Sequence, residues 1–159
     1  MTVLVPMGEA MYPSFLETSV RGYAEKNVAA GRWPAAGALE RARVEFERLL
    51  PRGLATPDQH LYDIRDHDGL TTVGHLWIAL QRHPGGASAY VYDVAVAPDH
   101  RRRGHARRAF VALEAVAASL GADSIGLHVH AHNDGARALY DELGFGVTGL
   151  NMVKRLGAA

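Results

Sequence analysis

The chain has 159 residues, the size of one ordinary domain, with 17 basic and 17 acidic side chains and no cysteine. The missing cysteines exclude a disulfide-stapled module and any cysteine-ligated zinc or iron–sulfur site. A hydrophobic content of 48% argues against disorder, and the zero net charge argues against a uniformly basic nucleic-acid binder. No apolar run approaches the ~20 residues that span a bilayer, and the N-terminal residues do not have the pattern of a signal peptide. We therefore expect a single cytoplasmic domain over residues 1–159 without a membrane partner.

The first third of the chain predicts one strand and two helices. The strand covers Thr2–Pro6, and apolar residues at helical spacing predict a helix over about Tyr12–Asn27. A second helix is expected over Pro34–Leu50, because proline suits a first helical turn. The turn residues of Pro51–Gly53 end that helix.

A run of strands follows in the middle of the chain. His60–Arg65 and Thr72–Leu80 are typical of strands and are separated by the turn residues Asp66–Gly69. After a second turn at Pro84–Gly86, Ser88–Val96 is an almost continuous run of strand formers. Such a run indicates a central strand that is covered on both faces.

The last third predicts alternating helices and strands. Apolar residues at regular helical spacing indicate an amphipathic helix over Ala106–Leu120, followed by a strand over Ser124–Val129. Because a helix connects them, this strand is expected to run parallel to Ser88–Val96. A helix capped by Asn133 extends to about Leu143, and a final strand is expected over Val147–Val153. The pattern predicts an α/β (α+β) fold, with a mixed sheet and helices on both faces.

A local positive cluster is hidden in the zero net charge. Five of the eight residues from 101 to 108 are arginine: Arg101, Arg102, Arg103, Arg107 and Arg108. They lie where a strand ends and a helix begins, so the free N–H groups of the first helical turn point outward beside them. Gly104 and Ala106 have little or no side chain to block a ligand. This combination predicts a phosphate or pyrophosphate site, and the alternative is a solvated helix start.

Two motifs on these elements resemble a known family. Arg101-x-x-Gly104-x-Ala106 is similar to the coenzyme A motif of the GCN5-related N-acetyltransferase (GNAT) superfamily. The segment from Asn133 to Phe145 is similar to that family's downstream Asn-x-x-Ala-x-x-Leu-Tyr-x-x-x-Gly-Phe signature. The resemblance implies a mixed, mostly antiparallel sheet with a splayed central pair of parallel strands, and acetyl-coenzyme A as cosubstrate.

The resemblance also implies roles for individual residues. The backbone of Val94–Val96 would pair with the pantetheine amides, the N–H groups of Arg102–Arg107 would hold the pyrophosphate, and Asn133 would touch the pantetheine. Tyr140 would protonate the departing thiolate, although its place on an apolar helix face also suits a core tyrosine. The implied cofactor-binding residues are Val94, Ala95, Val96, Arg101, Arg102, Arg103, Gly104, His105, Ala106, Arg107, Asn133 and Tyr140.

The general base is not settled by the sequence. His128 occupies a position where some relatives carry a glutamate, and a tyrosine or an ordered water chain are the alternatives. Tyr90 and Tyr92 share the strand face on which relatives place a base. Asp93 points the other way by strand alternation, so we expect it to pair with a neighbour in a structural role.

The expected reaction is direct transfer of an acetyl group to a primary amine on a small molecule or peptide. The resemblance implies a pocket built from the two N-terminal helices, the loop Pro51–Gln59 and the strands at 72–92. Trp33 and His75 are candidate lining residues, as is Trp77, for which core packing is the favoured alternative. Two other readings are a non-catalytic coenzyme A-binding module and, more weakly, a nucleic-acid binder. His128, His130 and His132 form a conceivable ligand set, but we expect no metal and no nucleic-acid partner. By analogy with relatives, a homodimer is one assembly to test.

Overall fold

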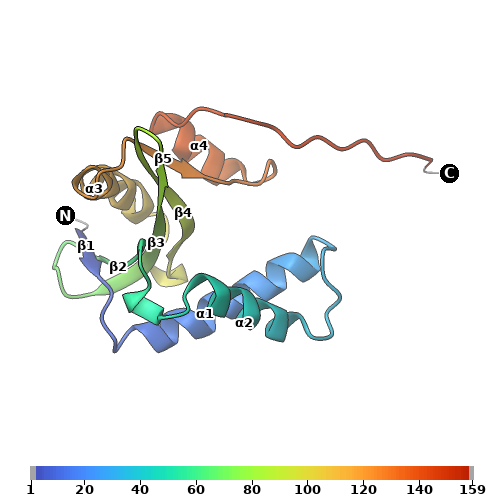
Figure 1. Cartoon of the computed structure of the whole chain (residues 1–159), viewed down its shortest axis with the longest axis horizontal. Coiled ribbons are helices and arrows are strands. Elements are labelled where there is room, and N and C mark those ends of the chain that lie inside the picture. The colour runs from blue at the N-terminus through green and yellow to red at the C-terminus, as the bar shows by residue number, and fades with distance from the viewer. Residues whose placement is uncertain (1–2, 158–159) are drawn as a thin grey trace. The chain divides into compact units, whose positions relative to one another are not determined.

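A five-stranded sheet, in the order β1-β2-β3-β4-β5, is the frame of the computed structural model, which describes residues 3–157 (Figure 1). Neighbouring strands are antiparallel except β4 and β5, which are parallel as expected. The predicted first strand is present as β1, and its residue Thr2 lies outside the described residues. The strands are β1 Val3–Pro6, β2 Gln59–Arg65, β3 Thr72–His83, β4 Gly86–Val96 and β5 Ser124–Leu127.

The four α-helices begin and end close to the predicted positions. They are α1 Tyr12–Ala29, α2 Ala38–Leu49, α3 His105–Ser119 and α4 Asp134–Glu142. Two short 3₁₀ helices, η1 Gly53–Ala55 and η2 Pro98–His100, lie in the connections. Helix α2 starts later than Pro34 because its N-cap is Gly37, whose φ of 76° is a left-handed conformation that precedes the first turn. Helix α4 is capped as predicted, since the Ala136 N–H donates to the Asn133 side chain.

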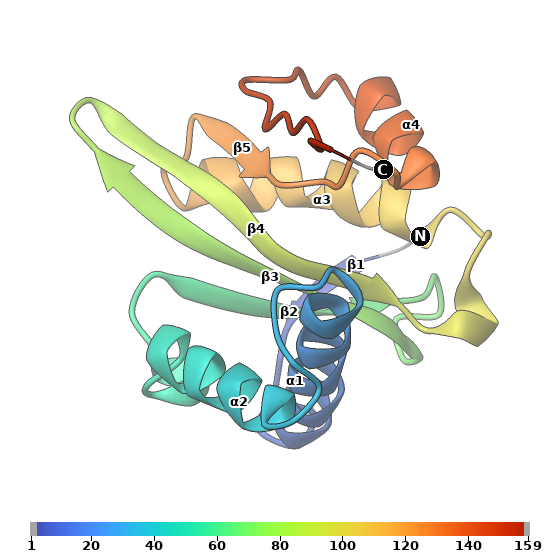
Figure 2. The same cartoon turned by 90° about the vertical axis from the view of Figure 1, so that its right-hand side faces the viewer.

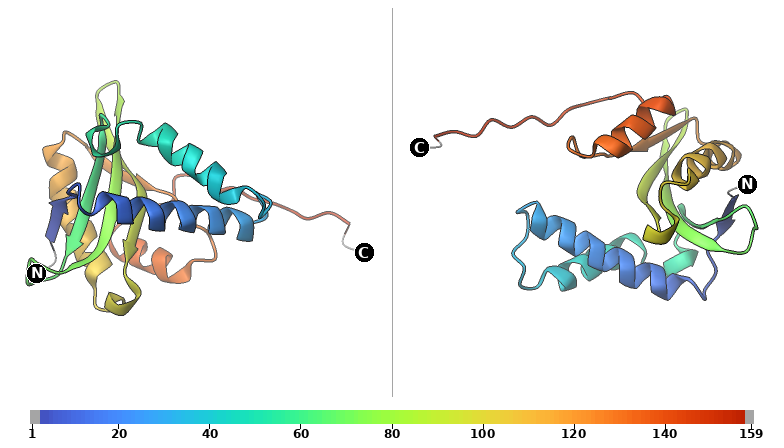
Figure 3. Two further views of the ribbon diagram at one scale, coloured as in Figure 1. Left: turned by 90° about the horizontal axis from the view of Figure 1, so that it is seen from below. Right: turned by 180° about the vertical axis from the view of Figure 1, so that it is seen from behind.

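The chain divides into two compact units. The first ends at His128 and contains the sheet with α1, α2 and α3, whereas the second begins at Val129 and contains α4. Within the first unit, α1 and α2 lie on one face of the sheet and α3 on the other (Figures 2 and 3). The prediction of helices on both faces is therefore confirmed.

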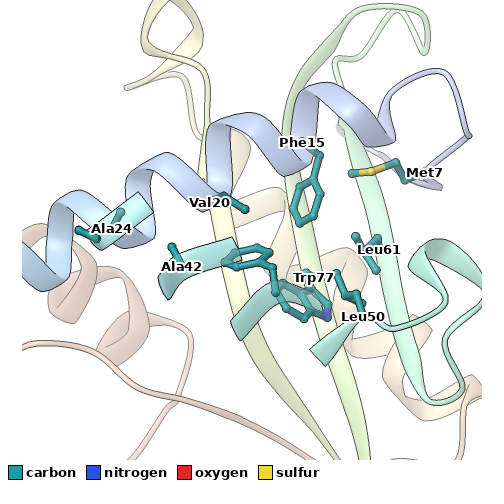
Figure 4. Packing of buried hydrophobic residues seen from close by; sticks show 10 residues of the cluster. Met7, Phe15, Val20, Ala24, Ala42, Leu50, Leu61 and Trp77 are labelled. Atoms are coloured by element: carbon teal, nitrogen blue, oxygen red, sulfur yellow. The ribbon is translucent and has the colours of Figure 1, made fainter. Parts of the chain in front are cut away.

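The core between α1, α2 and the sheet is built around aromatic side chains. Trp77 of β3 is 2% exposed and packs against Phe15 of α1, with ring centroids 6.2 Å apart (Figure 4). The ring centroid of Phe46 of α2 lies 5.6 Å from that of Trp77. Its indole N–H donates to the Gln59 side chain at 2.7 Å, so its polar atom is satisfied. Each such buried side chain contributes about 1.5–3 kcal/mol. This core fixes the face of the sheet on which the candidate site lies.

The strand predicted over Val147–Val153 is wrong. Residues 146–157 form neither helix nor strand in the structure (Figure 1). Their apolar side chains are largely exposed, with values of 72% for Val147 and 88% for Val153. A strand needs the backbone hydrogen bonds of a partner. No described strand pairs with this segment, so it does not become a strand.

Candidate active site

A β-bulge in β4 shapes the candidate site. Val91 pairs with Ile78 of β3 and Asp93 pairs with Trp77, so Tyr92 is an extra residue without a partner in the register. The extra residue reverses the alternation of side chains. Asp93 consequently lies on the same face as Tyr92, and the expectation that it points away from that face is wrong.

Asp93 is held in a polar network between β4, β3 and α1. Its Oδ2 accepts a hydrogen bond from the Ser19 hydroxyl at 3.1 Å and lies 2.8 Å from His75 Nε2. Burial raises the pKa of the Asp93 carboxyl, but the hydrogen bond and charge of His75, with the bond from Ser19, hold it below its usual value. The expected pairing of Asp93 with a neighbour is thus confirmed, and the neighbour is an imidazole.

Asp63 continues this network on the adjacent strand. It lies directly opposite His75 in the β2–β3 register and is 2% exposed, with Arg65 Nη2 at 3.8 Å from its Oδ2. Burial raises the pKa of the Asp63 carboxyl, although Arg65 and His75 oppose the change. His75 therefore stands between two carboxylates, one hydrogen-bonded and one across the strand pair.

A cavity of about 390 Å³ opens above this network. Aromatic and apolar side chains line it together with His75, Asp93 and several charged groups. The lining residues are drawn from α1, α2, β3 and β4 and include Tyr23, Lys26, Glu45, Phe46, Trp77 and Tyr92. His75 lines the cavity as expected, and Trp77, which is packed in the core as favoured, also contributes to the lining. Trp33 contacts Tyr23 at 5.5 Å between ring centroids without lining the cavity, and the described loop 51–59 contributes nothing to it.

The C-terminal half of β4 has an open edge within the first unit. Pairing with β5 covers Ser88–Val91 and stops there, whereas β4 continues to Val96. On its other side the segment Val94–Val96 pairs with Gly74–Leu76 of β3. The two parallel strands thus part where the sequence resemblance places the pantetheine, and the edge of β4 is directed away from β3.

The loop after β4 forms a cradle of backbone N–H groups. Arg102 has a φ of 63° and Gly104 a φ of 79°, and such left-handed turns aim successive N–H groups toward one point. Gly104 is the N-cap of α3, whose positive dipole end faces the same loop. Arg101, Arg102, Arg103 and Arg107 are exposed around it, Ala106 is half-buried and His105 is buried.

Two of the arginines brace the loop itself. Arg101 Nε donates to the Val96 carbonyl at 2.8 Å, and Arg108 Nη2 donates to the Arg103 carbonyl at 2.6 Å. The cluster therefore consists of structural braces as well as exposed charges. The sequence does not show which arginines brace the loop and which are exposed, because that depends on where each side chain lies in the structure.

Residues of the second unit and of its border complete the predicted set. Tyr140 is half-buried in α4, in ring contact with Phe145 at 5.5 Å, and burial raises the pKa of its phenol. The Asn133 side chain accepts the α4 capping bond from Ala136 N–H at 3.2 Å. His128 is exposed and lies just after β5.

Comparison with known proteins identifies this arrangement. The model of the acetyltransferase (GNAT) family matches residues 28–145. The chain belongs to the GNAT family of acetyltransferases. It is 38% identical to the uncharacterized N-acetyltransferase YycN of Bacillus subtilis strain 168, over 97% of this chain and 98% of YycN. It is 31% identical to YdgE, another uncharacterized N-acetyltransferase of that strain, over 96% and 97%.

Solved structures agree with this GNAT assignment. The crystal structure of YycN superposes with a TM-score of 0.89 at 36% identity, covering 98% of this chain and 99% of that one. AAC(6')-Iy in complex with the bisubstrate analog CoA-S-monomethyl-acetylneamine shares the fold, with a TM-score of 0.62 at 16% identity and 99% coverage of both chains. The protein is therefore an N-acetyltransferase of the GNAT family, whose members use acetyl-coenzyme A. Among residues 3–157, no helix is long and apolar enough to cross a membrane.

Proposed function

We propose that the protein transfers an acetyl group from acetyl-coenzyme A to a primary amine by direct attack. One observation carries the proposal: the His75–Asp93 pair lines the cavity, and Asp93 immediately precedes the open edge of Val94–Val96. An acceptor amine in the cavity and a thioester laid along that edge meet at the β4 bulge. GNAT acetyltransferases act on small-molecule or peptide acceptors, and this cavity suits the amine end of either class.

The coenzyme would be held by the loop and by the strand edge. The N–H groups of Arg102–Arg107 and the charges of Arg102, Arg103 and Arg107 suit its pyrophosphate. The backbone of Val94–Val96 would pair with the pantetheine amides and would supply donors to the tetrahedral oxyanion. We further propose that Asn133 contacts the pantetheine in addition to capping α4.

His75 is our proposed proton acceptor for the incoming amine. A lysine-type ammonium has a pKa of about 10.4, so it must lose a proton before or during attack. Because Nε2 of His75 bonds to the Asp93 carboxylate, the Nε2–H tautomer is favoured and Nδ1 is left to accept the proton. The Asp93 charge then stabilises the imidazolium. His128, which lies just after β5, is the candidate base that the sequence suggested, and the His128→Asn variant is compared with His75→Asn below.

Tyr140 is our proposed general acid. After the tetrahedral intermediate collapses, the carbon–sulfur bond breaks and the coenzyme A thiolate needs one proton. Burial raises the pKa of the Tyr140 phenol, so the group is protonated at neutral pH and is able to donate. The attacking nitrogen loses its second proton to solvent as the amide forms, and the His75 imidazolium also returns its proton to solvent. The Tyr140 oxygen regains one proton from solvent, so one proton is released in each cycle. The reaction balances without a covalent enzyme intermediate, which agrees with the absence of cysteine.

Thiol release from acetyl-coenzyme A tests this function against a panel of amines, polyamines, amino acids and peptides, with mass spectrometry of the product. For the best acceptor, Tyr140→Phe and His75→Asn should each lower kcat by about 10²–10⁴-fold, while His128→Asn serves as the matched histidine control. Coenzyme A should still raise the melting temperature of each variant. Binding without turnover on every amine would instead support a non-catalytic coenzyme A-binding module, and loss of activity in His128→Asn alone would move the base to His128.

A further inference from the structure

Three metal-ligating side chains from separate parts of the chain lie close together, and two of them flank the arginine loop 101–104. Asp66 follows β2, His100 ends η2, and His105 is the first residue of α3. One ligand atom from each lies within 4.8 Å of the other two, and Asp66 Oδ1 is 4.0 Å from His105 Nε2. That separation is too long for a hydrogen bond and suits two ligands that share an ion.

The burial of the two imidazoles makes this cluster unlike a surface group of polar residues. His105 is 3% exposed. His100 Nδ1 is also buried, and it has no hydrogen-bond partner in the part of the chain that the structure describes. A buried nitrogen without a partner costs about 1–3 kcal/mol, so such atoms in native proteins call for an explanation. A cation coordinated through Nδ1 would give this nitrogen a partner.

We propose that Asp66, His100 and His105 bind one Zn²⁺ ion, with water in the fourth position. Two neutral imidazoles and a carboxylate are a common zinc ligand set, and three protein ligands with one open position are typical of accessible sites. At bond lengths of about 2.0–2.1 Å, tetrahedral ligand atoms lie ~3.4 Å apart, so the side chains need to close by about 1 Å.

The surroundings predict which metal is selected. Arg103 and Arg108 lie close to His105, and their charges oppose any cation. Mg²⁺ and Ca²⁺ bind through charge and oxygen ligands, and the cluster offers them a single carboxylate against this repulsion. Zn²⁺ gains from direct coordination by imidazole nitrogen. The site should therefore take Zn²⁺ and reject Mg²⁺ and Ca²⁺.

Metal binding at this place would stiffen the phosphate cradle. His100 and His105 flank the loop 101–104, in which Arg102 holds a left-handed φ of 63° that is uncommon for a residue with a side chain. A shared ion would join both ends of the loop to the turn after β2. Holding the loop in its binding conformation lowers the ordering cost of phosphate binding. We therefore expect Zn²⁺ to tighten coenzyme A binding as well.

Titration of the tag-free full chain with Zn²⁺, in competition with a chromophoric chelator, tests the site. We expect one equivalent to bind, and Co²⁺ in its place to show the visible absorption of a tetrahedral ion. Asp66→Asn and His100→Asn should each weaken Zn²⁺ binding by more than about 100-fold, because loss of a residue that only supports a ligand costs about 10–100-fold. Asp66→Asn keeps an oxygen to accept the His67 N–H bond, so this variant should fold.

The matched control removes the exposed, stacked pair His130 and His132, whose ring centroids are 5.5 Å apart. The double variant His130→Asn/His132→Asn should bind Zn²⁺ like the wild type. The proposal is overturned if Zn²⁺ does not bind, if binding survives in Asp66→Asn and His100→Asn, or if it is lost in the control. Equal binding of Mg²⁺ would also overturn it. These readouts do not depend on acetyl transfer, so failure here leaves the proposed function untouched.

Discussion

Replacing Asp93 by asparagine removes one charge from the polar network while keeping its shape. In the wild type, one carboxylate oxygen receives the Ser19 hydroxyl at 3.1 Å and lies 2.8 Å from His75 Nε2. The amide oxygen of asparagine is able to occupy the same position and accept both bonds. The perturbation is therefore electrostatic, and its effects on stability and on activity are separable.

The expected loss of stability follows from the two hydrogen bonds. A bond to a charged group contributes about 1.5–3 kcal/mol and a neutral bond about 0.5–1.5 kcal/mol, so the exchange should cost about 1–3 kcal/mol. For a chain of this size that lowers the melting temperature by about 2–12 °C. Because the folded pKa of Asp93 lies below its unfolded value of about 3.9, this contribution is present above pH ~4 and disappears as pH falls below it.

The loss of activity should exceed the loss of stability. Without the carboxylate, His75 is neither oriented in the Nε2–H tautomer nor stabilised as an imidazolium, and kcat should fall by about 10²–10⁴-fold. Ser19→Ala is the matched control, since it removes one bond and keeps the charge and His75. It should cost about 1 kcal/mol and less than 10-fold in kcat.

Urea unfolding from about pH 3 to 7 and steady-state kinetics on the same preparations provide the two measurements. An Asp93→Asn variant that keeps wild-type kcat would refute the role of the His75–Asp93 pair in proton transfer. A stability difference that stays constant down to pH 3 would refute the assignment of the charged network itself.

Three further variants test other parts of the structure. Gly74→Ala places a Cβ against the Ala95 carbonyl oxygen, so it should cost about 1–3 kcal/mol in urea unfolding and weaken coenzyme A binding, and wild-type values for both would contradict the close strand contact. Burial raises the pKa of Asp63, so its contribution to stability is present below pH ~3.9 and is lost as pH rises through the folded pKa. Asp63→Asn should therefore gain stability over the wild type as pH increases, and a gain independent of pH would show another cause. Asn133→Ala should cost about 1 kcal/mol and speed amide exchange at Ala136, whereas unchanged exchange would argue against the α4 cap.

Local signals in the sequence located the elements of the site. Helix α3 begins at His105, directly after the glycine of the Arg101–Ala106 motif, and α4 begins directly after its asparagine cap. Caps, helical periodicity and turn residues act through bonds between residues a few positions apart, so a linear reading reveals them. The same reading predicted the parallel pair β4 and β5, because a helix must intervene between parallel neighbours.

Strand pairing decided what the linear reading missed. Val147–Val153 has the composition of a strand, but a strand forms only with a partner. Strict alternation along the strand predicts the wrong face for Asp93, because the residues around Tyr92 do not indicate that it forms a bulge against β3. A one-residue shift of register turns every later side chain over, and here it brought Asp93 to His75.

The sequence by itself determined the family, the arginine loop at a helix start and the order of the elements, since each is written in residues close together along the chain. The tertiary structure alone decided which groups meet. Ser19, His75 and Asp93 come from α1, β3 and β4, and Asp66 reaches His100 and His105 across the sheet's end. Such meetings depend on register and packing between distant segments, which short-range periodicity does not encode.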